Sequence, residues 1–317
     1  MSTVNTVLGP IQKSELGATL SHEHVLVASA GIQQLYPEFI DRSETIERAV
    51  AQLSEAYDEG LRTIVDVTTI DLGRDIKLLE EVSQRTKVNI IPCTGTWLDI
   101  PRVFWSATPD MIADLYVREI ELGIENTSIK AGVIKVATDL EGVTPQGEII
   151  LRAAARASIK TGVRISTHTN SIERMGEKQI AIFEEEGVSP SHICIGHSND
   201  TTDRNYLIGM AEKGYYIGLD HYPGGRVAGS IDWQERTRIL KDLVDAGIGD
   251  KLMLSHDHST STTIATRAAY GDRQAFNPDG YLFVSRNVLP RLKELGVDAT
   301  SIEKLVYQNP QEYFFGE

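Results

Sequence analysis

Two histidines separated by one residue, His22 and His24, have a type and spacing that can perform chemistry. Side chains two positions apart on a β-strand point to the same face, so both imidazoles would face one side and Glu23 the other. Such a pair can bind one side of a metal ion. Alone, a His-x-His pair is about as often two unrelated histidines, so the residues that accompany it decide the interpretation.

Further residues of metal-binding type end later apolar runs. His168 and His197 each follow a short β-branched or apolar segment, and Asp257 lies three residues after Leu254, in the last part of another apolar run. An unpaired buried carboxylate is costly, so Asp257 is expected to bind a metal or to pair with a cation. The alternative is a cap for the next helix. Beside four histidines that can converge, metal binding is favoured.

Lys135 is the unusual member of this group, because the apolar segment Gly132–Ala137 places its amine inside the fold. An ammonium cannot bind a metal ion and would repel it. Lys135 is therefore a base with a depressed pKa, a lysine that has reacted with carbon dioxide, or the partner of an acid such as Asp66. The carbamate formed with carbon dioxide has two oxygens that could bridge two ions roughly 3.5–4 Å apart.

These residues belong to eight short apolar runs that alternate with helical patterns. Near-continuous apolar runs are typical of strands buried on both faces, as in a parallel sheet covered by helices. Eight alternations without a Pro/Gly/Ser-rich linker predict a single-domain (β/α)8 TIM barrel over residues 1–317, and the carboxyl ends of its strands would form the active-site face. The predicted strands are Ala18–Val25, Arg62–Thr69, Asn89–Trp97, Ala131–Asp139, Arg164–Asn170, Ile193–Asp200, Tyr215–Tyr222 and Lys251–His258.

Helix signals lie between these runs. Glu44–Asp58 has apolar residues at three- and four-residue spacing, and Thr108-Pro109-Asp110 combines a hydroxyl cap, a first-turn proline and an acid. The segment Thr201–Lys213 leaves room for only a short helix. Residues 1–14 are expected to form a β-hairpin across the barrel end, with Gly9-Pro10 at its turn.

Composition narrows the function classes. The formal net charge of −14 argues against nucleic acid or an anionic membrane as partner and favours a small neutral substrate. The first residues lack a signal peptide and no apolar run could cross a bilayer, so a cytoplasmic location is expected, although a trimmed signal stays open. Cys93 and Cys194 lie in predicted strands without metal-binding spacing and are expected to be free thiols.

The chain as a whole resembles the phosphotriesterase family of the amidohydrolase superfamily, which includes bacterial phosphotriesterases and phosphotriesterase-like lactonases. The resemblance runs from Asn5 to Pro310, and its blocks together are highly specific. These blocks are Leu20–His24, Lys130–Thr138, Ser166–Thr169, Ile195–Asp200, Gly218–His221 and Asn277–Gly280.

The resemblance implies two divalent metal ions, with zinc expected first and cobalt, manganese and iron as alternatives. A carboxylated Lys135 and a hydroxide would bridge the two ions. It also implies a homodimer. The more buried ion would be held by His22, His24, Lys135 and Asp257, and the more exposed one by Lys135, His168 and His197.

The same resemblance assigns catalytic and pocket residues. Asp257 would take the proton of the attacking hydroxide, and Asp200 and His221 would lie on its outward path. Trp97 would form a wall of the leaving-group pocket and Tyr222 would line the pocket. For both aromatic residues, packing at the barrel rim is the alternative.

The substrate is less defined, because the blocks point to two branches of the family. The stretch Pro223–Asp232 is shorter than in phosphotriesterases and Ser255–His258 is similar to the lactonases, whereas Asp220–Pro223 and Asn277–Gly280 are similar to phosphotriesterases. We expect a hydrolase of lactones and aryl esters with phosphotriesterase activity. The main alternative is a primary organophosphate triester hydrolase. A one-metal deaminase has no need of Lys135, and a non-catalytic binding barrel has no need of a water-activating ligand set.

Overall fold

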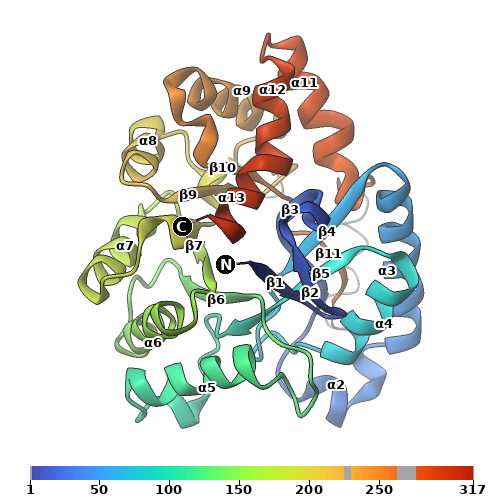
Figure 1. Cartoon of the computed structure of the whole chain (residues 1–317), viewed down its shortest axis with the longest axis vertical. Helices are drawn as coiled ribbons and strands as arrows, with labels where there is room; N and C mark the ends of the chain where they lie inside the picture. The colour runs from blue at the N-terminus through green and yellow to red at the C-terminus, as the bar shows by residue number, and fades with distance from the viewer. Residues whose placement is uncertain (1, 225–229, 263–275, 317) are drawn as a thin grey trace.

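The computed structural model describes residues 2–224, 230–262 and 276–316. Nine parallel strands form one curled sheet, surrounded by a ring of helices (Figure 1). The strands of this sheet are β3 (Ala18–Val27), β4 (Leu61–Asp66), β5 (Asn89–Gly95), β6 (Val133–Thr138), β7 (Arg164–Thr169), β8 (Ile193–Ile195), β9 (Tyr216–Leu219), β10 (Leu252–Leu254) and β11 (Ser259–Thr262). Their order is β10-β9-β8-β7-β6-β5-β4-β3-β11, which confirms the predicted (β/α)8 barrel. That the whole chain is one domain stays a prediction.

The eighth strand differs from its prediction, because it is divided into β10 and β11. β10 pairs with β9 and β11 pairs with β3, so the two pieces together close the barrel. Between them Asp257 has a φ of 51°, which interrupts a regular strand. The buried Glu23 carboxylate bonds the freed backbone there, accepting the N–H groups of His256 at 3.0 Å and His258 at 2.8 Å.

Other strands also end earlier than the apolar runs predict. β8 stops at Ile195, because His197 has a φ of 57° and Ser198–Asp200 forms a 3-10 turn. β9 stops at Leu219, two residues before His221. Several predicted site residues therefore lie just beyond the strands, where the backbone has left the hydrogen-bonded ladder.

The helices follow the predicted pattern. The Asp41 side chain caps α3 and the Thr108 hydroxyl caps α5, and α8 is indeed short. The helices are α1 (Lys13–Leu16), α2 (Ile32–Leu35), α3 (Arg42–Asp58), α4 (Ile76–Thr86), α5 (Pro109–Glu121), α6 (Pro145–Thr161), α7 (Met175–Glu186), α8 (Arg204–Glu212), α9 (Trp233–Leu243), α11 (Leu289–Glu294), α12 (Ala299–Glu303) and α13 (Asn309–Phe315). Among the described residues, no helix is long and apolar enough to cross a membrane.

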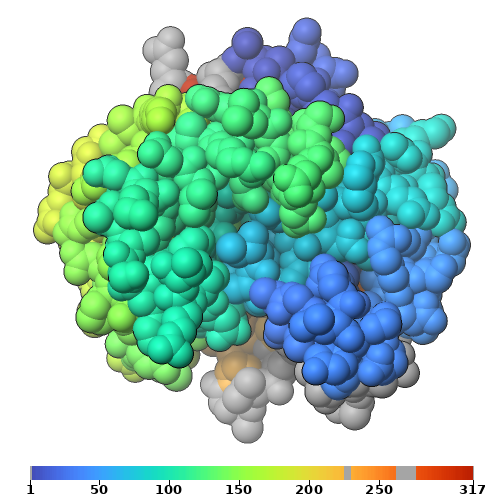
Figure 2. Space-filling view, turned by 90° about the horizontal axis from the view of Figure 1, so that it is seen from below, coloured from blue at the N-terminus to red at the C-terminus, as the bar shows by residue number. Residues whose placement is uncertain are grey.

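The N-terminal hairpin is present, formed by β1 (Thr3–Thr6) and β2 (Gly9–Gln12). Its turn is Val7-Leu8 and not Gly9-Pro10, because Thr6 pairs with Gly9. The hairpin and the segment around α2, which follows the carboxyl end of β3, lie toward opposite ends of the molecule (Figure 2). The hairpin therefore covers the amino end of the barrel and leaves the carboxyl ends of the strands for chemistry. Cys93 and Cys194 are buried and unpaired, as predicted.

Candidate metal centre

Histidine and aspartate side chains converge at the carboxyl ends of the strands. His22, His24 and Asp257 form one group whose potential ligand atoms lie within 4.8 Å of one another, and His197, His221 and Asp257 form another. Asp257 Oδ1 lies 3.1 Å from His24 Nε2 and 3.6 Å from His22 Nε2. The alternative role of Asp257, as the cap of a following helix, is excluded, because Asp257 lies between the strands β10 and β11 and not before a helix. Such a donor set suits a divalent transition metal.

Lys135 lies on β6 beside this group, with 1% of its surface exposed. Its Nζ is 2.8 Å from His22 Nε2. Asp66, the alternative partner, instead accepts the backbone N–H groups of Val25 and Thr68. Burial lowers the pKa of Lys135 from 10.5 to about 8, so the neutral amine is far more populated near neutral pH than in an exposed lysine.

The His22 imidazole is kept neutral. Burial, together with the nearby Lys135, lowers the pKa of His22 to about 4. A histidine must be neutral to bind a metal, so this environment favours the form that a ligand needs.

His168 ends β7 on the other side of the cluster. It lies outside the tight groups above, but its ring centroid is 4.4 Å from that of His197 and 5.7 Å from that of Trp97. Its Nε2 faces Asp139 Oδ2 at 3.4 Å. Nδ1 is therefore the nitrogen of His168 that is available to bind a metal ion. The structure thus brings His168 next to the remaining predicted ligands.

Asp257, His221 and Asp200 form a continuous polar chain that leads outward. His221 Nε2 lies 3.3 Å from Asp257 Oδ2, and His221 Nδ1 lies 2.6 Å from Asp200 Oδ2. Burial alone would lower the pKa of His221, but Asp200 and Asp257 together outweigh it and raise this pKa to about 10. Arg236 contacts the second oxygen of Asp200 at 2.7 Å. The distances suit proton transfer along the chain.

The two aromatic residues predicted for the pocket have different surroundings. Trp97 is half-buried, follows β5, and donates its backbone N–H to Asp71 at 3.0 Å. Tyr222 has 2% of its surface exposed and belongs to the core, although it borders a small cavity with Asp257 and Phe276. Their roles toward a substrate stay predictions.

Comparison with known proteins decides the family. The family model described as "Phosphotriesterase family" matches residues 2–314. The chain belongs to the phosphotriesterase family.

Relatives from three organisms share nearly the full length of this family member. The "Phosphotriesterase homology protein" of Mycobacterium tuberculosis is 38% identical over 331 residues, covering 99% of this chain and 98% of its own. The "Aryldialkylphosphatase" of Saccharolobus solfataricus is 36% identical over 308 residues and covers 96% of both chains. The "N-acetyltaurine hydrolase" of Dictyostelium discoideum is 27% identical over 365 residues, covering 97% of this chain and 96% of that one. This phosphotriesterase-family chain is a metal-dependent hydrolase.

Sequence reasoning gave no role to several residues that hold this family member's centre in place. Thr68 Oγ1 is 2.8 Å from His24 Nδ1, and Asp139 contacts His168. Asp220 and Arg236 are buried and contact predicted site residues, and the buried Glu23 accepts the backbone N–H groups on either side of Asp257. An acid or base at the end of an apolar run, as in Gly218-Leu219-Asp220, is the signal that could have identified Asp220.

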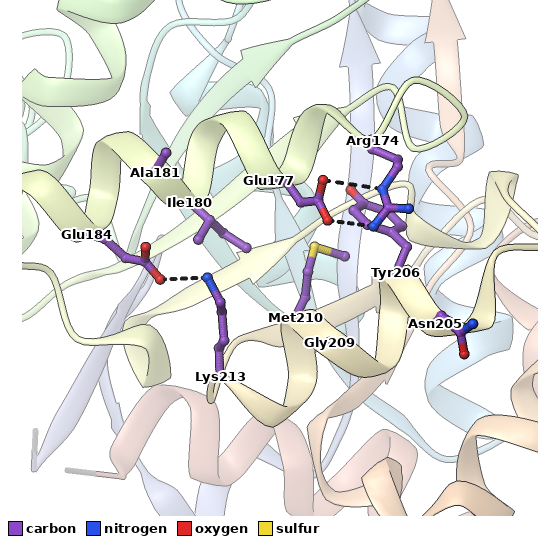
Figure 3. Close-up of a pocket in the computed structure, with 10 residues that line it drawn as sticks. All are labelled: Arg174, Glu177, Ile180, Ala181, Glu184, Asn205, Tyr206, Gly209, Met210 and Lys213. Atoms are coloured by element: carbon purple, nitrogen blue, oxygen red, sulfur yellow. Dashed lines mark hydrogen bonds and ion pairs between the residues drawn. The ribbon is translucent and has the colours of Figure 1, made fainter.

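A second hollow lies on the outside of the barrel, between α7 and α8 (Figure 3). Two ion pairs line it: Arg174 lies 2.7 Å from Glu177 at the start of α7, and Lys213, just after α8, lies 3.1 Å from Glu184 of α7. None of the ten residues that line it is a predicted site residue. Exposed ion pairs of this kind contribute little to stability.

Proposed function

We propose that this chain is a two-metal hydrolase of lactones and aryl esters, with phosphotriester hydrolysis as a second activity. The observation that carries the proposal is the convergence of five metal-binding side chains around the buried Lys135 amine. The more buried ion would be held by His22, His24, Asp257 and Lys135, and the more exposed one by His168, His197 and Lys135.

Carboxylation of Lys135 would complete this donor set. The neutral amine would attack carbon dioxide, forming an N–C bond and releasing one proton, which leaves an anion with two oxygens. The Lys135 amine lies 2.8 Å from His22 Nε2, so a carbamate formed on it would carry its oxygens beside a nitrogen proposed to bind the metal. The lowered pKa of Lys135 supports the amine's reactivity.

The chain's own residues would then move the proton. Two bound divalent ions would supply a hydroxide at neutral pH and polarise the carbonyl or phosphoryl oxygen of the substrate. Asp257 would accept the proton at Oδ2, which lies 3.3 Å from His221 Nε2. His221 would pass a proton on to Asp200 through the 2.6 Å contact at Nδ1. Arg236 fixes the second oxygen of Asp200 and so keeps its carboxylate aimed at His221.

Substrate preference is proposed from the short connection between β9 and α9. Arg236 packs against both sides of this connection: its Nε donates to Ile231 O at 3.0 Å, and Gly224 approaches its guanidinium so closely that a Cβ there would overlap it. Only residues 225–230 lie between Gly224 and Ile231, and 225–229 are outside the described residues. A short connection offers few walls to orient the three substituents of a phosphorus centre. A lactone ring already fixes its carbonyl relative to the leaving oxygen.

We therefore expect kcat/KM for aryl and small aliphatic lactones to exceed that for a dialkyl aryl phosphotriester by about 10- to 100-fold, because misplacement by about 1 Å can cost about 100-fold. The measurement is a substrate panel on the zinc-loaded chain, with aryl esters and N-acetyltaurine as further arms. Lengthening the 225–229 segment should shift the ratio toward phosphotriesters. Phosphotriester hydrolysis near the diffusional limit with poor lactone turnover would instead establish the organophosphate hydrolase alternative.

A further inference from the structure

Asp220 is a buried carboxylate that contacts predicted ligands of both ions. It follows β9, has 1% of its surface exposed, and accepts from His197 twice, from the backbone N–H at 2.7 Å and from Nδ1 at 2.9 Å, both at Oδ1. Its Oδ2 lies 3.0 Å from His22 Nδ1, a buried nitrogen that has no other partner among the described residues. His22 is a proposed ligand of the more buried ion and His197 of the more exposed one.

The backbone around Asp220 is built to admit its carboxylate. A Cβ at Gly218 would lie 2.6 Å from Asp220 Oδ2, and a Cβ at Gly196 would lie 3.1 Å from the same oxygen. Side chains at these two positions would push the carboxylate out of its place between the ends of β8 and β9. The glycines therefore support the position of Asp220 independently of its hydrogen bonds.

The other proposed histidine ligands have partners of their own. His24 Nδ1 contacts Thr68 Oγ1 at 2.8 Å, and His168 Nε2 contacts Asp139 Oδ2 at 3.4 Å. Thr68 and Asp139 each contact one proposed ligand, whereas Asp220 contacts two. Asp139 is therefore a matched control, since it is an aspartate that serves a single ligand.

We propose that Asp220 is a positioning residue that holds His22 and His197 together and so couples the two metal sites. This inference rests on the proposed two-metal function. A carboxylate that accepts Nδ1–H fixes the tautomer in which Nε2 keeps its lone pair for a metal, and it raises the basicity of the ring. Because one carboxylate does this for two ligands, its loss weakens both sites at once.

The amide variant Asp220→Asn should affect His22 and His197 differently. Its oxygen would stay with His197, because both the backbone N–H and the Nδ1–H of His197 point to Oδ1. The amide NH2 would then face His22 Nδ1, which would have to accept. The His22 proton would move to Nε2, the atom proposed to bind the metal, so this variant should weaken the buried site more than the exposed one.

The test compares Asp220→Ala, Asp220→Asn and Asp139→Asn, each stripped with a chelator and then titrated with zinc against a competing chelator. Both zinc affinities should fall by about 10- to 100-fold in Asp220→Ala, the cost of losing such a partner. In Asp220→Asn the affinity of the buried site should fall more than that of the exposed site, and in Asp139→Asn only one affinity should fall. Imidazole nitrogen NMR of the metal-free chains should show Nδ1–H for His22 and His197 in the wild type, and Nε2–H for His22 in Asp220→Asn.

Two results would overturn the inference. One is a loss of a single zinc site, or of none, in Asp220→Ala. The other is a wild-type, metal-free chain in which His22 or His197 carries its proton on Nε2, a measurement that needs no variant to fold. If the wild-type chain instead binds fewer than two zinc ions while both histidines carry Nδ1–H, the two-metal function fails and the positioning role of Asp220 stands.

Discussion

Lys135→Ala is expected to lose hydrolase activity by more than about 100-fold together with most of its bound metal, since losing an outer partner of a ligand alone costs 10–100-fold. The reason is geometric: Lys135 would supply an oxygen to both ions, so its removal opens both sites. Its buried position against His22 leaves a space that a short carboxylic acid could enter. Added acetate or propionate should therefore restore part of the metal and part of the activity.

Metal content and turnover of Lys135→Ala, measured with and without added acid, check this prediction. Lys251→Ala is the control, because Lys251 is partly buried over the Tyr216 ring and touches none of the proposed ligands in the contacts described for it. The metal content and the turnover of Lys251→Ala should match those of the wild type and should not change when the acid is added. Two ions per chain in Lys135→Ala without any acid would rule out the bridge.

Asp257→Asn should abolish turnover, because Asp257 is proposed as both a metal ligand and the first proton acceptor. His221→Ala and Asp200→Ala should keep their metals and slow the reaction by a smaller factor, on the order of 10²- to 10⁴-fold, the usual contribution of a proton-transfer group. In the proposed mechanism, bound metal ions would still activate the nucleophile in these variants. What they lose is the path on which the proton leaves Asp257 through the 3.3 Å and 2.6 Å contacts of His221.

A series of aryl esters with different leaving groups distinguishes this role from packing. Loss of the proton path should slow substrates with poor leaving groups more than those with good ones, since only the former need proton transfer in the slow step. His192→Ala serves as the control, because His192 lies in the short 3-10 turn before β8, at the opposite end of the strand from His197. Equal losses across the series in His221→Ala would point to a structural role.

The sequence predicts the residues that its local periodicity positions. His22 and His24 lie on β3 and both approach Asp257, as strand alternation predicts, although the pairing of β3 with β4 shifts register between Leu20 and Glu23. Lys135 lies within an apolar run. The proton path was assigned only through the family resemblance. Asp200 and His221 lie beyond the strand ends, and their contact joins positions 21 residues apart.

The strand break at Asp257 and the roles of Asp220 and Arg236 were missed from the sequence, because they depend on contacts between distant segments. Asp257 leaves the ladder because Glu23, more than two hundred residues earlier, bonds the flanking backbone. The proposed role of Asp220 depends on its contacts with His22 on β3 and with His197, which follows β8. Arg236 reaches Asp200 from the start of α9. No periodicity within one segment carries such information, and only the closed barrel brings these groups together.

A zinc titration of the chelator-treated wild-type chain tests the two-metal centre most directly. Bound zinc and the rate of lactone hydrolysis are measured in the same samples as zinc is added. If His22, His24, His168, His197, Asp257 and Lys135 form one centre with two sites, binding should reach two ions per chain and activity should appear with the second. Full activity at one ion per chain, or activity that persists without metal, would contradict the account.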